Sequence, residues 1–111
     1  MAVRPPVAEF LAAGPLPPEE EPEEVIEKAQ NLLEQVEASA PLTDEEARAL
    51  VAGFGPDGCF GLAWTLLHVI ETAPGAMTAE YLAGTGNYWV DMLRSRVEYA
   101  RWEREQKDQE P

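Results

Sequence analysis

Residues 57–73 read Asp-Gly-Cys-Phe-Gly-Leu-Ala-Trp-Thr-Leu-Leu-His-Val-Ile-Glu-Thr-Ala, and this stretch decides the fold. Within residues 59–70 the only polar side chains are Thr65 and His68, and no side chain is charged. A helix that is apolar around its whole circumference has to be covered on every side. The stretch therefore predicts a central helix over about residues 58–73, with the flanking segments packed around it.

The flanking segments have the spacing of amphipathic helices, and nothing alternates as a strand would. Apolar side chains recur every one or three positions along residues 23–38, which is the pattern of a helix with one buried stripe. Thr43 and Glu46 form the capping-box pattern that begins a second, short helix. After residue 77 we expect a short helix, a corner, and a long helix from about Tyr88.

These elements predict an all-α fold, a small bundle of four to five helices around the central apolar helix. The helical domain is expected to span residues 23–107, and residues 108–111 are expected to fray. Residues 1–22 hold six of the ten prolines and run into three consecutive glutamates, so they predict a flexible, disordered Pro/Glu-rich arm. The alternative is that Phe10 and Leu11 dock this arm on the domain or on a partner.

The overall composition restricts the classes of partner. The formal net charge is -13 and the pI is about 4.3. Like charges repel over a Debye length of about 8 Å in physiological salt, which argues against binding nucleic acid or an anionic membrane surface. The longest apolar run is about 12 residues, well short of the about 20 that a membrane-spanning helix needs.

The cysteine count indicates the cellular compartment of the protein, and the amino-acid composition indicates the type of genome that encodes it. Cys59 is the single cysteine, so no internal disulfide of a secreted scaffold is possible. We therefore expect a cytoplasmic protein. Arginine, alanine, glycine and proline are abundant, which is typical of a GC-rich bacterial genome.

Few residues carry the chemistry of a catalytic, metal or cofactor site. His68 and Glu71 share a helix face, but a di-iron site would need a second such pair and two further glutamates. We interpret His68 as a hydrogen-bonded core histidine and Cys59 as an inert buried thiol. The sequence predicts no catalytic residue, no metal and no cofactor. The enzyme alternative is that His68, Glu71 and Cys59 together line a pocket.

Two local features of the chain have structural interpretations. Residues 53–58 match G-x-G-x-x-G, but a helical pattern precedes them where a dinucleotide site needs a strand, so we interpret them as a corner with Asp57 as N-cap. Glu71 lies near the end of the central helix, where the helix dipole disfavours a negative charge. We expect Arg94 or Arg96 of the long helix to pair with it.

The acidic residues are concentrated in one part of the chain. Residues 19–46 contain eleven acids and one base, Lys28, whereas residues 94–111 contain five of each. The structural explanation is a solvated face, and the functional one is a surface that steers a basic partner. The long helix also carries a second stripe of side chains that needs a neighbour of its own: Tyr88, Met92, Ser95, Tyr99 and Trp102.

We therefore expect a non-catalytic acidic protein-binding module that docks on a basic protein partner. The most concrete form is an immunity protein or antitoxin-type inhibitor that covers a toxin enzyme. The alternative is a structural or assembly protein that acts as a helical homodimer or complex subunit. The residues expected to bind the partner are acids that steer and aromatic side chains that anchor: Glu23, Glu27, Glu34, Glu37, Asp44, Glu45, Tyr99 and Trp102.

Overall fold

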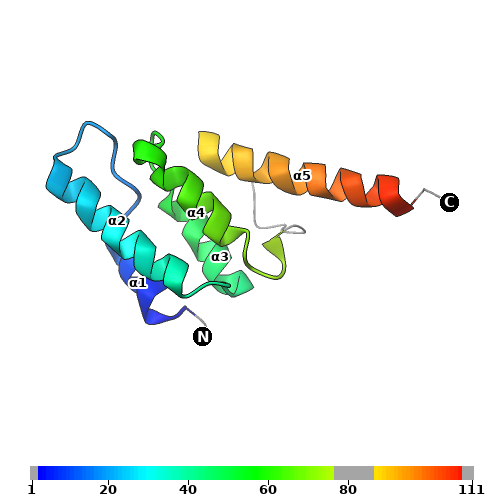
Figure 1. Ribbon diagram of the computed structural model, residues 1–111, viewed down its shortest axis with the longest axis horizontal. Helices are drawn as coiled ribbons and strands as arrows, with labels where there is room; N and C mark the ends of the chain where they lie inside the picture. Colours follow the sequence, from blue (N-terminus) through cyan, green and yellow to red (C-terminus); the bar gives the residue numbers. More distant parts are fainter. Residues whose placement is uncertain (1–2, 77–86, 109–111) are drawn as a thin grey trace.

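The computed structural model describes residues 3–76 and 87–108, which form α-helices and two short 3-10 turns with no strand among them. Helix α4 contacts α2, α3 and α5, and α1 packs on α2 and α3 (Figure 1). The predicted all-α bundle around a central helix is therefore confirmed. The helices are α1 (Pro5–Ala12), α2 (Glu23–Ala38), α3 (Asp44–Leu50), α4 (Leu62–Ile70) and α5 (Tyr88–Asp108).

The central helix α4 is shorter than the predicted 58–73. Cys59 and Phe60 have φ angles of 45° and 51°, and Gly61 has a φ of 91°. Three left-handed residues in succession cannot continue a right-handed helix, so they form a separate turn, Cys59–Gly61, before α4 begins. The expectation that Asp57 is the N-cap of the central helix is wrong, because Gly61 holds that position in α4. Asp57 Oδ1 instead accepts the backbone N–H of Cys59 at 2.9 Å, just before the turn.

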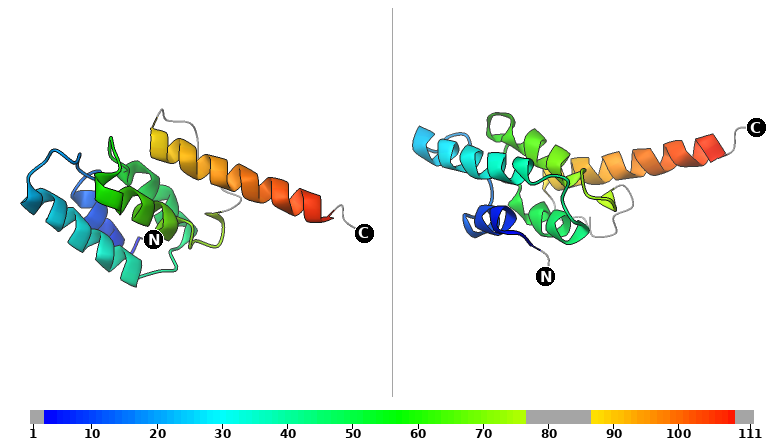
Figure 2. Two further views of the ribbon diagram at one scale, coloured as in Figure 1. Left: turned by 45° about the horizontal axis from the view of Figure 1, so that its top comes forward. Right: turned by 60° about the horizontal axis from the view of Figure 1, so that its bottom comes forward.

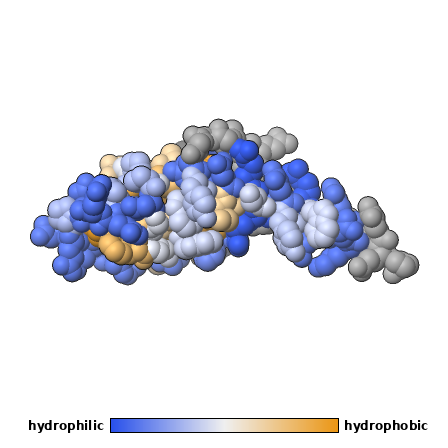
Figure 3. All heavy atoms as spheres, turned by 90° about the horizontal axis from the view of Figure 1, so that it is seen from above, coloured by the Kyte–Doolittle hydropathy of each residue, from blue (hydrophilic) through white to orange (hydrophobic). Residues whose placement is uncertain are grey.

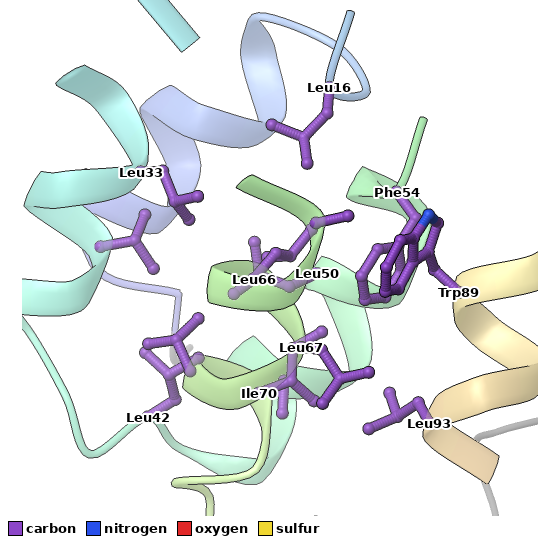
Figure 4. Packing of buried hydrophobic residues seen from close by; sticks show 14 of the residues in the cluster. Leu16, Leu33, Leu42, Leu50, Phe54, Leu66, Leu67, Ile70, Trp89 and Leu93 are labelled. Carbon is purple, nitrogen blue, oxygen red and sulfur yellow. The ribbon is translucent and has the colours of Figure 1, made fainter. Parts of the chain in front are cut away.

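The core surrounds one side of α4. Leu66, Leu67 and Ile70 are fully buried, and Figure 4 shows them between Leu33 of α2 and Trp89 of α5. The opposite side of α4 is open: Trp64 is 40% exposed, and His68 is exposed as well. The prediction that α4 is covered on every side is therefore wrong for this strip.

The prediction of a disordered N-terminal arm is wrong for the described residues 3–22. Val7 and Phe10 of α1 and Leu16 of the following loop are all at most 2% exposed. Burying side chains of this kind contributes roughly 1.5–3 kcal/mol each, which outweighs the disorder that the composition favours. The docking alternative for Phe10 is thus the correct one, and the helical unit includes this segment.

The positions of the prolines explain why they do not prevent the N-terminal segment from packing on the other helices. Pro5 and Pro6 stand in the first turn of α1, where a missing backbone donor costs no helical hydrogen bond. The loop after α1 is attached to the corner before α4, where the N–H of Leu16 donates to the carbonyl of Gly53 at 2.8 Å. A Cβ on Gly55 would overlap the carbonyl oxygen of Leu16, so only glycine permits this close approach.

The remaining helices begin where the sequence patterns place them. The capping box of α3 is present, with Thr43 Oγ1 accepting the N–H of Glu46 at 3.1 Å. The side chain of Asn87 accepts the N–H of Trp89 at 2.8 Å and so caps the start of α5. The short helix and corner expected after residue 77 fall on residues 77–86, outside the described residues, as do residues 109–111 of the expected frayed tail.

Helix α5 packs on the bundle through its first half only. Its buried side chains are Trp89, Val90, Leu93 and Val97, and beyond Val97 no described residue is buried. Figure 2 shows the second half extending away from the other helices in both views. Among the described helices, none has the length and apolar character needed to cross a bilayer.

Candidate protein-binding surfaces

The outer side of α2 carries a row of carboxylates, which we call the acidic face: Glu23, Glu27, Glu34 and Glu37. All four are exposed, and at 3.6 residues per turn they lie within about 80° of one another around the helix. The core-facing side chains Leu33 and Val36 point to another side. Within the described residues none of the four carboxylates forms a salt bridge. The four glutamates are therefore exposed on one side of α2, and their role in binding a partner stays a prediction.

The acidic face continues into a hollow at the start of α2. The hollow has a volume of about 440 Å³, and glutamates provide most of its charged lining. Phe60 contributes an aromatic ring that is 67% exposed. Carboxylates beside an exposed ring can hold a lysine or arginine side chain, because the cation gains both ion pairing and a cation–π contact. The lining consists of Glu19, Glu21, Glu23, Ile26, Glu27, Gln30 and Phe60.

Hydrogen bonds fix Phe60 in this position. Its N–H donates to Glu19 Oε2 at 2.8 Å, and the N–H of Glu19 donates to Asp57 Oδ2 at 2.9 Å. The left-handed backbone of Phe60 costs roughly 1–2 kcal/mol relative to a right-handed one. The sequence pattern does not indicate an exposed Phe60, because it predicts that this residue lies within the apolar central helix. The available signal was the pair of glycines, Gly58 and Gly61, that flank it closely.

Asp44 and Glu45 lie apart from the acidic face, at the start of α3. Both are exposed. Asp44 Oδ1 accepts the N–H of Gly75 at 2.7 Å, and this hydrogen bond attaches the chain after α4 to the start of α3. Of the two, Glu45 is the one whose carboxylate has no hydrogen bond within the described residues.

The two predicted aromatic anchors lie on the second half of α5. Tyr99 is 60% and Trp102 53% exposed, and their ring centroids are 5.8 Å apart. This half of α5 extends away from α2 (Figures 1 and 2). The structure therefore does not join these aromatic side chains to the acidic face, and the predicted docking set falls on two separate surfaces.

An apolar hollow of about 450 Å³ lies between α1 and α2. Phe10, Val25 and Leu32 contribute to its lining, with Lys28 at the same site. Val25 is 41% exposed. The end of the molecule that holds the start of α2 is largely hydrophilic, with a small hydrophobic patch within it (Figure 3).

The residues of the enzyme alternative lie in three different settings. His68 is exposed and tilted against Trp64 with ring centroids 5.9 Å apart, so the interpretation as a core histidine is wrong. Cys59 is fully buried, and burial together with the charges of Asp57 and Glu19 raises the pKa of its thiol. This agrees with an inert thiol.

Glu71, the third residue of that alternative, has a cation as its partner. Arg96 donates from Nε to Oε2 at 2.6 Å and from Nη2 to Oε1 at 2.9 Å. The expected pairing of Glu71 with an arginine of the long helix is therefore confirmed for Arg96. In the described part of the chain, no three histidine, cysteine, aspartate or glutamate side chains are grouped so as to hold a metal ion.

Comparison with known proteins identifies no relative of this chain. No family model, no curated protein and no solved structure matches it. A function is therefore inferred from the charge and shape of the protein's own surfaces.

Proposed function

We propose that the protein is a non-catalytic acidic module that docks on a basic protein partner in the bacterial cytoplasm. Its most concrete form is an immunity protein or antitoxin-type inhibitor of a basic toxin enzyme. The acidic face of α2 carries this proposal. Like charges three or four residues apart destabilise a helix slightly, and Glu34 and Glu37 lie beyond the first turn of α2, where the helix dipole would favour an acid.

A basic partner would give the acidic face a role. Complementary potentials raise association rates by a factor of about 10 to 10³. The hollow beside Phe60 would then receive one lysine or arginine of the partner, with the carboxylates of Glu19, Glu23 and Glu27 around the cation. Glu34, Glu37 and Glu45 would steer the approach from further along the surface.

The settings of the possible catalytic residues support a non-catalytic role. Hollows lie at α1–α2, beside Phe60, and between Glu71 and α5 in the described part of the chain. None of these three is lined by more than one of His68, Cys59 and Glu71. The alternative function, a structural or assembly protein, draws on a different surface, the second half of α5.

The test begins with capture of partners by the tagged full-length chain from its native host, followed by measurement of association rates with the purified partner. The double variant Glu34→Lys/Glu37→Lys should slow association at least about tenfold, and wild-type association should slow steeply between about 0.05 and 0.5 M salt. The matched control is Glu9→Lys/Asp91→Lys, which changes the net charge equally but lies on α1 and α5.

Two results would contradict the proposal. One is an association rate that does not change with salt, and the other is an equal loss for both double variants, which would reflect net charge rather than the acidic face. The inhibitor form has its own readout, since the activity of an enzymatic partner should titrate to zero at one chain per partner. If the partner stays active in the complex, the protein is a docking module but not an inhibitor.

A further inference from the structure

Among the described residues, no other helix packs against the second half of α5. From residue 98 to residue 107 every side chain is exposed except Ala100, which is half-buried. Isolated helical segments shorter than about 12–15 residues are marginal in water, so a free helix end of this length gains little stability from its own hydrogen bonds. A partner packed along it would supply the missing contacts.

One side of this free half has the spacing of a coiled-coil seam. Ser95, Tyr99, Trp102 and Gln106 follow one another at intervals of four, three and four residues, which is the heptad pattern of two helices in contact. At 3.6 residues per turn this side is nearly opposite to the buried side chain of Leu93. The seam is therefore turned away from the bundle and accessible to another helix.

The charge distribution indicates what covers the seam. Residues 94–111 carry five bases and five acids, so the whole net charge of -13 belongs to the rest of the chain. A basic partner would gain no electrostatic attraction here. A second copy of the chain, which is repelled from every strongly acidic part of the molecule, meets no net like charge at this helix.

We propose that two copies associate through the second halves of α5, packed antiparallel along this seam. Tyr99 of each copy then faces Trp102 of the other, and Ser95 faces Gln106. Glu103 of each copy comes beside Arg96 of the other, whose guanidinium also pairs with Glu71 of its own copy, at two symmetric places. The antiparallel arrangement also puts the two acidic bodies at opposite ends of the dimer, where their repulsion is smallest.

Glu98 and Glu105 flank the other side of the seam, and in this arrangement each faces the other in the second copy. This like-charge contact weakens the dimer, and its removal is a specific test. The proposal is independent of docking on a basic partner. If both hold, each dimer presents two acidic faces and binds two partners.

The first experiment measures molecular mass by sedimentation equilibrium from about 1 μM to 1 mM, a range that covers Kd values expected for small interfaces. The mass should rise from 12.2 kDa towards twice that value. Trp102→Ala and Tyr99→Ala should each raise Kd at least about tenfold, and Glu105→Lys should lower it. The matched control is Tyr88→Ala, an aromatic that is 62% exposed on the same helix but outside the overlap.

A second experiment tests the orientation through disulfide formation, since the native Cys59 is buried. Ser95→Cys/Gln106→Cys should cross-link into covalent dimers on mild oxidation, whereas Ser95→Cys alone should not. Cross-linking of the single variant at the same rate would overturn the antiparallel arrangement. A monomer at every concentration, or a dimer that Trp102→Ala and Tyr99→Ala leave unchanged, would overturn the proposal itself and assign the seam to a foreign protein.

Discussion

Arg4 and Glu46, 42 residues apart in the chain, meet through three hydrogen bonds. Arg4 donates from Nε to Oε2 at 3.0 Å, from Nη2 to Oε1 at 2.8 Å, and from its backbone N–H to Oε2 at 2.9 Å. Glu46 is fully buried, and its Oε1 also accepts the N–H of Thr43 at 3.0 Å. One buried carboxylate therefore holds the residue before α1 and the residue before α3 in place.

Removing the arginine from this pair should destabilise the protein strongly. Arg4→Met leaves the carboxylate of Glu46 buried with only two backbone N–H donors, those of Thr43 and of residue 4, and no cation. Breaking a buried pair in this way costs about 3–5 kcal/mol. We expect a lower free energy of unfolding by about 3 kcal/mol in urea titrations. Glu45→Gln is the control, because its exposed neighbouring carboxylate should matter by less than about 0.5 kcal/mol. Equal effects of the two substitutions would show that the pair is unimportant.

The same pair predicts a dependence of stability on pH. The Arg4 guanidinium, together with the backbone N–H groups of Thr43 and Arg4, lowers the pKa of Glu46 from 4.5 to about 2. A carboxyl whose pKa is lower in the folded state stabilises the fold fully above its unfolded pKa. This contribution is lost as the pH falls from about 4.5 through 2.

The measurement compares wild type with Glu46→Gln in urea at pH 7 and at pH 2.5. Taking the difference between the two proteins removes the effect of the many other acids, which titrate in both. The difference should be largest at pH 7 and should shrink at pH 2.5 by an amount on the order of 2 kcal/mol. A difference that stays constant across this range would contradict the lowered pKa.

The N-terminal segment shows where local sequence patterns fail. Its prolines and glutamates favour disorder when only their neighbours in the sequence are considered. What they leave out is the pairing of Arg4 with a residue 42 positions away and the burial of Phe10 and Leu16 against the bundle. No periodicity within residues 1–22 records either contact, because both depend on a surface that other helices create.

The parts that could be predicted depend on signals local to one helix. The capping box of Thr43 and Glu46 fixes the start of α3, and the dipole at the end of α4 explains why Glu71 needs Arg96. The acidic face was predictable because four glutamates at helical spacing share one side. The exposed ring of Phe60 was not, since the left-handed turn that displays it is held by a hydrogen bond that the Phe60 N–H donates to Glu19, 41 positions away in the chain.

Loss of the cation beside Glu71 should loosen the attachment of α5. The side chain of Glu71 is 12% exposed and stands at the end of α4, where the helix dipole already disfavours its charge. Arg96→Met should therefore lower the free energy of unfolding by about 1 kcal/mol. In a double-mutant cycle with Glu71→Gln, the coupling energy should be of about that size. Arg101→Met, an exposed arginine on the same helix, is the control and should have little effect.

Phe60 offers a test that separates stability from binding. Its left-handed backbone is unfavourable for any residue with a Cβ, and its ring is mostly exposed, so Phe60→Gly should raise the free energy of unfolding by about 1 kcal/mol. Phe60→Val should lower it by a similar amount, because a β-branched residue tolerates this conformation least. Chemical denaturation of the three proteins checks the order.

The same substitution should weaken binding if the hollow receives a cation of the partner. Phe60→Gly removes the ring but leaves every carboxylate, so the Kd for the basic partner should rise about three- to tenfold, the range expected for one cation–π contact at a partly exposed site. Phe60→Tyr keeps an aromatic face and should bind as the wild type does. A more stable Phe60→Gly protein with unchanged affinity would mean that the strained turn does not serve this partner.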